Sequence, residues 1–203
     1  GIDCSKTDMV QAREESEVAA RVAEDEQGMH RIVKFTLVVV RCPFKESPHY
    51  NKWLAVLETR GMGWYLPAGG VDHGETFMEA GRREAIEEAN MDIIFKGWIS
   101  VDPLPKRDWT KREALRTILY AEPRTIEAAN NPKNWIDVES EKAEWKTVAE
   151  LEEFKARNML RSPDLLNLAS YLEKGGHIYP IGLLGEGNGP ADPEASSSFD
   201  ITQ

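Results

Sequence analysis

Three glutamates, Glu84, Glu87 and Glu88, stand close together within the sequence LPAGGVDHGETFMEAGRREAIEEANM, residues 66–91. On a helix, residues three or four positions apart lie on the same side, so Glu84 neighbours both of the others. Like charges at these spacings destabilise an isolated helix. The arrangement therefore favours a cation outside the helix that relieves the repulsion.

The helix that carries these acids is predicted from its start signal. Thr76 followed by Glu79 is a capping box, which places the helix start at about residue 76. At about 100° per residue the three acids fall nearly opposite an apolar side. That side is formed by Met78, Ala85 and Ala89, with Ile86 on its flank. We expect the helix to pack through these residues and to project the carboxylates from its far face.

A solvated acidic face is the alternative interpretation of such a charge run. Three features count against it. A glycine-bearing loop is expected before the helix, and its glycines, including Gly69, allow the backbone to come close to a ligand. A predicted strand leads directly to the helix, which is the usual way to hold a site on a rigid scaffold. Arg83 is placed to pair with an acid such as Glu75 rather than to neutralise the three carboxylates.

Clustered carboxylates of this kind are typical of sites for hard cations, so Mg²⁺ or Mn²⁺ is expected rather than zinc. Mg²⁺ typically binds through a few carboxylates together with substrate phosphates. Bound divalent ions screen phosphate charge and activate a water molecule as the nucleophile. The pattern therefore predicts metal-assisted hydrolysis of a phosphoanhydride.

The spacing of the charged residues resembles the Nudix box, at residues 69–91. The positions that carry the resemblance are Gly69, Glu75, the run Arg83-Glu84-Ala85-Ile86-Glu87-Glu88, and Asn90-Met91. Asn90 stands where the family usually has glycine. Since Asn is the residue that best replaces glycine in a left-handed conformation, we expect the turn at the helix end to be kept.

The resemblance implies a role for each matching residue. Glu84, Glu87 and Glu88 would be metal ligands, joined by the backbone carbonyl of Ala68 or Gly69. The other implied roles are a supporting ion pair, Glu75 with Arg83, and a general base, by default Glu87 or Glu88 with Glu139 as the variant. Many members of the family add a carboxylate six residues before the Trp that opens the last strand. With Trp145 as that Trp, the match is Glu139, with Glu141 in reserve and a plain surface acid as the alternative.

The resemblance also implies the fold class, an α/β Nudix fold with a mixed β-sheet sandwiched between α-helices. The strands expected from apolar patterning are residues 31–42, 53–60, 93–101 and 114–123. Helices are expected within residues 145–154 and at 162–176, with Ser162 as cap and Pro163 in the first position. We divide the chain into an acidic N-terminal extension at 1–30, a Nudix hydrolase domain at 31–184 and a disordered tail at 185–203.

A basic loop between residues 102 and 116 is the candidate for substrate recognition. Its cations could hold phosphates and its indole could stack on a base. The substrate-binding candidates are Arg107, Trp109, Lys111 and Arg112, beside Lys106 and Arg116. The alternative is a solvated loop with a Trp in the core. Trp64 and Trp98 are expected in the core, and His73 is expected to face solvent.

The substrate class follows only loosely from the sequence. Beyond the box, the later strands and the last helix resemble MutT-type enzymes that hydrolyse oxidised purine nucleoside di- or triphosphates. ADP-ribose and dinucleoside polyphosphates are the rivals. An RNA cap and an inositol pyrophosphate fit less well, because the surface is acidic overall and a second large basic cluster is not found. A catalytically silent nucleotide-binding Nudix module is disfavoured, since every charged box position is present.

Composition limits the classes of partner. The 203 residues carry a formal net charge of −10, which argues against a nucleic-acid duplex or an anionic membrane as the main partner. Only two cysteines occur, Cys4 and Cys42, so a disulfide framework is not expected. The sequence shows neither a signal-peptide core nor a membrane span, and we expect a soluble cytoplasmic protein. A short helical stretch is expected within the N-terminal extension. This stretch and the tail are candidates for homodimer formation or partner binding.

Overall fold

The computed structural model describes residues 32–105 and 113–184. Most of them belong to one compact unit, Lys34–Leu104 with Leu115–Gln203. The strands are β1 Val33–Val40, β2 Trp53–Glu58, β3 Gly63–Tyr65, β4 Ala68–Gly70, β5 Ile93–Leu104, β6 Ala114–Pro123 and β7 Ser140–Lys146. The helices are α2 Phe77–Ala89, α3 Ile126–Ala129, α4 Val148–Ala156 and α5 Asp164–Glu173, followed by the 3₁₀ turn η1 Ile181–Leu183.

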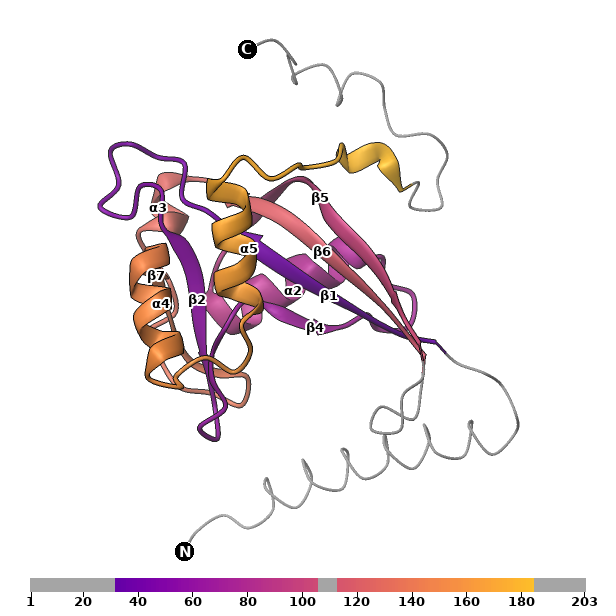
Figure 1. Cartoon of the computed structure of the whole chain (residues 1–203), viewed down its shortest axis with the longest axis horizontal. Helices are drawn as coiled ribbons and strands as arrows, with labels where there is room; N and C mark the ends of the chain where they lie inside the picture. Colours follow the sequence, from indigo (N-terminus) through magenta and orange to yellow (C-terminus); the bar gives the residue numbers. More distant parts are fainter. Residues whose placement is uncertain (1–31, 106–112, 185–203) are drawn as a thin grey trace, which may run out of the picture. The chain divides into compact units, whose positions relative to one another are not determined.

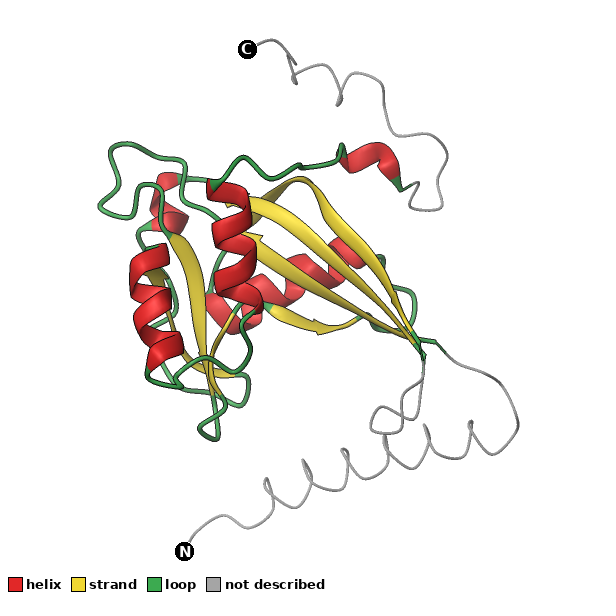
Figure 2. Cartoon of the chain, in the orientation of Figure 1, coloured by secondary structure: helices red, strands yellow, loops and turns green. Residues whose placement is uncertain are grey.

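The strands form two sheets (Figure 2). One has the order β4-β1-β6-β5, and the other has the order β3-β2-β7. In the first sheet β4 pairs antiparallel with β1, so that Gly69 lies opposite Thr36. In the second sheet β2 runs antiparallel to both of its neighbours. The pairing of β4 with β1 positions the chain segment that leads into α2.

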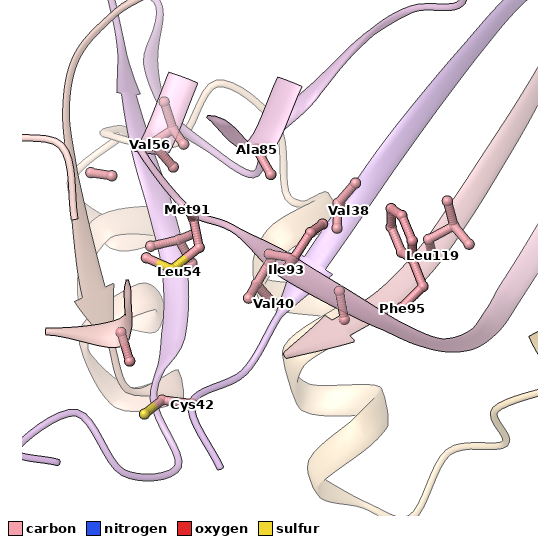
Figure 3. Packing of buried hydrophobic residues seen from close by; sticks show 14 of the residues in the cluster. Val38, Val40, Cys42, Leu54, Val56, Ala85, Met91, Ile93, Phe95 and Leu119 are labelled. Atoms are coloured by element: carbon pink, nitrogen blue, oxygen red, sulfur yellow. The ribbon is translucent and has the colours of Figure 1, made fainter. Parts of the chain in front are cut away.

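Strand β1 is buried on both faces, which explains its continuous apolar sequence. Val38 and Val40 join the cluster that contains residues of α2, and Figure 3 shows them near Ala85. Leu37 and Val39 join the cluster that contains residues of α5. Because successive side chains of a strand point to opposite faces, α2 and α5 cover opposite faces of this sheet (Figure 1). The predicted α/β class, with sheet between helices, is confirmed.

The strands predicted from apolar patterning are present, with ends that shift by a few residues. Trp64 and Trp98 lie in the core as expected. Two details differ. The glycine-bearing segment Ala68–Gly70, predicted as a loop, is strand β4. Helix α5 begins at Asp164 with Pro163 as the residue before it, one position later than predicted, and Ser162 Oγ accepts a bond from the Asp164 amide.

Three predicted features lie outside the described residues, namely the N-terminal extension, the tail and most of the basic loop. Cys42 is a buried free thiol. Among the helices that the structure describes, none combines the length and the hydropathy that a membrane crossing requires.

Candidate functional site

Helix α2 carries the candidate acids, and both of its ends form as the sequence predicts. At its start, the Thr76 amide donates to the Glu79 carboxylate at 2.9 Å and the Glu79 amide donates to Thr76 Oγ1 at 3.1 Å. At its end Asn90 takes the left-handed conformation, with φ 52° and ψ 40°. Asn90 therefore keeps the left-handed turn for which the resemblance led us to expect a glycine.

The three candidate acids of α2, Glu84, Glu87 and Glu88, differ in exposure, which corrects the predicted helix face. Glu84 is 7% exposed and Glu88 is 6% exposed, whereas Ile86, predicted on the apolar side, is 48% exposed. Glu87 is exposed to solvent. A period of 3.6 residues places Glu84 and Glu88 one turn apart, beside Ala85 and Ala89, on the side that packs against the sheet. The acids therefore do not form a solvated face.

Strand β4 receives the two buried carboxylates. The Ala68 amide donates to Glu88 Oε2 at 3.0 Å. A Cβ atom added to Gly69 would lie 1.8 Å from Glu84 Oε1, so only glycine allows this carboxylate to reach the strand backbone. The doubled glycine of the sequence therefore serves the approach of a side chain from α2.

Burial makes both carboxyl groups harder to ionise. It raises the pKa of Glu88 to about 8, against the opposing bond from the Ala68 amide, and the charges of Glu84, Glu58 and Glu139 raise it further. Burial also raises the pKa of Glu84, an effect that Arg83 opposes. Ionising two buried carboxyl groups side by side is costly. A cation bound beside them would stabilise their charged forms.

Arg83 lies at the centre of the ion pairs around these acids. Its Nε and Nη2 donate to the two oxygens of Glu75, at 2.9 Å and 3.1 Å, and Nη2 also donates to the Gly70 carbonyl at 2.8 Å. Its Nη1 donates to Glu84 at 2.6 Å and to Glu87 at 3.1 Å. The predicted pair with Glu75 is present. The expectation that Arg83 would not pair with the three acids is wrong, because it bonds both Glu84 and Glu87.

The structure places Glu139 immediately before β7 and exposes it to solvent. Its charge raises the pKa of both Glu84 and Glu88, so it acts on the same site as the helix acids. Glu141 lies inside β7. Trp145 is the sixth residue of that strand and does not open it, which corrects the landmark used to find Glu139.

Sequence reasoning missed Glu58, at the end of β2. This side chain is buried and paired with Arg161, and its Oε2 has no hydrogen-bond partner among the described residues. Strand alternation places residues 54, 56 and 58 on one face, so Leu54 and Val56 predict a buried acid at this position. Lys133 and Ser140, which contact the end of α2, were also missed, and their polar loop context carries no signal for them.

Most of the predicted substrate-binding residues lie outside the described residues, namely Arg107, Trp109, Lys111 and Arg112. Arg116, at the edge of that loop, is described. Its Nη2 pairs with Asp102 at 2.9 Å, and its Nη1 lies 3.9 Å from Asp164. These contacts make Arg116 part of the scaffold. His73 is exposed, as expected.

The residues of α2 fit a hard divalent cation. Within the described ranges, no three His, Cys, Asp or Glu side chains already have the spacing of a metal site. The donor set is nevertheless all oxygen, which suits Mg²⁺ or Mn²⁺. Two of its carboxylates are buried and costly to ionise, and Gly69 provides the space that they occupy.

Comparisons with known proteins agree with this fold. The family described as NUDIX domain matches residues 34–165. A search of curated proteins finds no match. The structure is similar to a NUDIX hydrolase from Nitrosomonas europaea, at 20% identity and a TM-score of 0.58 over 76% of this chain and 97% of that chain.

Two further structures are similar, and their names mention nucleotide ligands. The NUDIX domain of Shewanella oneidensis NrtR, complexed with ADP ribose, is 15% identical with a TM-score of 0.54, over 73% of this chain and 91% of that chain. The Ap4A hydrolase of C. elegans is 17% identical with a TM-score of 0.50, over 71% of this chain and 99% of that chain. These likenesses show the fold. With a family match that spans residues 34–165, more than half of its length, the chain belongs to the Nudix family.

Proposed function

We propose that this protein is a divalent-metal-dependent pyrophosphohydrolase that cleaves a phosphoanhydride bond in a nucleoside diphosphate derivative. The cofactor would be Mg²⁺ or Mn²⁺. The first substrate class to consider is a nucleoside di- or triphosphate, including oxidised forms. The observation that carries the proposal is the pair of buried carboxyl groups, Glu84 and Glu88, held against β4 beside the exposed Glu87.

Each residue of the site has a distinct part in this proposal. Glu84, Glu87 and Glu88 hold the metal together with the backbone carbonyl of Ala68 or Gly69. When bound, the metal supplies Lewis-acid stabilisation of the phosphate oxygens and lowers the pKa of a water molecule. Arg83, through its bonds to Glu75 and the Gly70 carbonyl, keeps the start of α2 fixed to the end of β4.

The proton of the attacking water needs an acceptor within hydrogen-bond reach. Glu87 is the first candidate among the helix acids because its carboxylate is exposed to solvent and approachable from outside. Glu139 is the second candidate, since its charge acts on the same acids from the β7 side. Glu88 is a weaker candidate for this part, because its carboxylate is buried and bonded to the Ala68 amide.

Two other substrate classes belong in the same test. The names of two similar structures mention ADP ribose and Ap4A, so ADP-ribose and dinucleoside polyphosphates are the second candidate class. For any of these substrates, we propose that the phosphates and the base are bound by Arg107, Trp109, Lys111 and Arg112. That assignment comes from residue type and from their place in the basic loop.

The test is release of phosphate and nucleotide from a panel of substrates with Mg²⁺ or Mn²⁺. The panel contains normal and oxidised nucleoside di- and triphosphates, ADP-ribose and dinucleoside polyphosphates. We expect one class to be turned over, and chelation of the metal to abolish the reaction. We expect Glu87→Gln to lower kcat by about 10²-fold or more, as removal of a catalytic proton acceptor or metal ligand does.

The matched control is Glu152→Gln, which makes the same replacement of a carboxylate by an amide in an exposed residue of α4. This variant should retain full activity. If the intact protein binds a nucleotide and turns over none of the panel, the hydrolase proposal fails and a nucleotide-binding module takes its place. Equal loss in both variants would contradict a specific part for Glu87.

A further inference from the structure

The loop between α3 and β7, residues 130–139, leaves its apolar side chains in solvent. Trp135 is 48% exposed, Ile136 is 74% exposed and Val138 is 79% exposed. Burial of apolar surface therefore contributes little to the shape of this loop. Since Glu139 is its last residue, polar contacts at the base of the loop must decide where that carboxylate lies.

Lys133 is the main polar contact at that base. Its side chain is completely buried, and its Nζ donates to the Glu87 carbonyl at 2.8 Å and pairs with Asp137 Oδ2 at 2.6 Å. Its backbone amide donates to the Ala89 carbonyl at 2.9 Å. A buried ammonium is tolerated only when it is paired and hydrogen-bonded, so these contacts are the reason for its position. The last turn of α2 contains no basic residue, and Lys133 provides positive charge there from another part of the chain.

Asp137 extends the contact from Lys133 to Glu139. Its Oδ1 accepts bonds from the Glu139 amide at 2.9 Å and from the Ser140 amide at 3.1 Å. Ser140 Oγ then donates to the Glu88 carbonyl at 2.7 Å. The network thus runs from the last turn of α2, through Lys133 and Asp137, to the backbone on both sides of Glu139, and returns to α2.

We propose that Lys133, acting through Asp137, is a positioning residue that sets Glu139 against the acids of α2. The inference extends the proposed function, because it assigns Glu139 to the same metal and pyrophosphate site. Lys133 does not touch the substrate in this proposal, since Glu87 and Asp137 occupy its ammonium group. The geometry between the helix acids and the loop acid therefore depends on one buried side chain.

The test is a double-mutant cycle read by Mn²⁺ binding without substrate. Free Mn²⁺ is titrated by electron paramagnetic resonance against the full chain, Lys133→Met, Glu139→Gln and the double variant. We expect each single variant to weaken Mn²⁺ binding by about 10-fold, as loss of a supporting contact to a metal ligand does. We expect the double variant to be no weaker than about the poorer single variant, because both changes remove the same interaction.

Additive losses in the double variant would overturn the proposal, and so would unchanged Mn²⁺ affinity in folded Lys133→Met or in Glu139→Gln. The matched control is Lys96→Met, which removes a lysine paired with Glu122 at 3.3 Å and should leave Mn²⁺ affinity unchanged. If Lys133→Met does not fold, Asp137→Ala takes its place in the cycle. It interrupts the network at an accessible residue and should lose a similar factor in affinity.

A readout without metal separates this inference from the proposed function. Hydrogen exchange of the Glu139 and Ser140 amides should quicken in Lys133→Met and in Asp137→Ala but not in Lys96→Met. If these amides exchange at the rate of the unmodified protein, the proposed network is wrong whatever the enzyme does. If the cycle and the exchange rates are as expected but no substrate is turned over, the hydrolase proposal fails and the positioning role stands.

Discussion

At the scale of single residues, the contact between Gly69 and Glu84 is the tightest steric constraint in the site. A Cβ atom on Gly69 would lie 1.8 Å from one carboxylate oxygen of Glu84, far inside any real contact distance. A Cβ atom added to the neighbouring Gly70 would have no other atom within 4 Å. A side chain at residue 69 would therefore displace the Glu84 carboxylate, whereas a methyl group at residue 70 would meet no neighbour.

We predict that Gly69→Ala displaces the Glu84 carboxylate and weakens Mn²⁺ binding by at least about 10-fold, the usual effect of moving a ligand. Gly70→Ala adds the same methyl group in open space and should change binding by less than about twofold. Titration of Mn²⁺ against both variants, after circular dichroism has shown them folded, checks the prediction. Equal Mn²⁺ affinities in the two variants would show that Mn²⁺ binding does not depend on the position of the Glu84 carboxylate against β4.

Residue types alone named the candidate acids of the site, but they did not show how each of these side chains is held. The box spacing identified Glu84, Glu87 and Glu88, and the glycines before them. It did not reveal that Arg83 bonds two of these acids as well as Glu75. Such contacts depend on the backbone of β4, which brings Gly70 within reach of the same guanidinium.

At the scale of elements, the ends of α2 were predictable and its buried face was not. The start at Thr76 and the turn at Asn90 depend on local side chain to backbone bonds, which a short stretch of sequence contains. The face depends on what packs against it. Hydrophobicity placed Ile86 near the core, whereas the structure buries Glu84 and Glu88 because β4 offers them an amide and the space of a glycine.

Strand β4 shows a second limit of prediction at this scale. Its sequence, Ala68-Gly69-Gly70, has low strand propensity and was assigned to a loop. The strand forms because β1 provides a register of three residue pairs for it, from Leu37 opposite Ala68 to Phe35 opposite Gly70. Pairing with β1 therefore outweighs the low strand propensity of this segment. The same pairing positions the Ala68 amide that bonds Glu88.

The end of α2 gives a prediction about stability. Asn90 has φ 52°, and its Nδ2 donates to the Asn131 carbonyl at 3.0 Å. Asn90→Ala should lower the free energy of unfolding by about 1–2 kcal/mol, because an alanine pays the full steric cost of the left-handed conformation. Asn90→Gly avoids that cost and should remain within about 1 kcal/mol of the unmodified protein. Urea denaturation of both variants measures the difference, and an alanine variant as stable as the glycine variant would refute it.

At the scale of the whole molecule, the site is assembled from segments far apart in the chain. Lys133 Nζ reaches the Glu87 carbonyl across 46 residues, and Ser140 reaches the Glu88 carbonyl across 52 residues. Sequence patterns describe neighbours within about one helix or strand. They predicted the fold class and placed the candidate acids together on one helix, but they did not predict these contacts. Contacts of this length depend on the packing of α2 against β4, β5 and β7, and only the folded chain reveals them.

The same long-range packing brings His49, in the loop between β1 and β2, against Trp145 of β7. The two rings are stacked with centroids 6.0 Å apart. Burial lowers the pKa of His49 from 6.5, and the charge of Lys52 lowers it further. The buried Nδ1 atom has no hydrogen-bond partner among the described residues, so a proton there gains no new contact. The folded chain therefore favours neutral His49.

This preference predicts how stability depends on pH. Between the lowered pKa of folded His49 and the ordinary value of 6.5, the unfolded chain binds a proton that the folded chain does not. The free energy of unfolding contributed by His49 is therefore complete above pH 6.5 and declines as the pH falls below it, by at most about 1.4 kcal/mol per pH unit for one proton. Urea denaturation of the unmodified protein and of His49→Gln between pH 5 and pH 8 isolates this contribution, because carboxyl groups titrate alike in both. We expect the unmodified protein to lose more stability on acidification than the variant, and parallel curves would show that His49 is not held neutral by the fold.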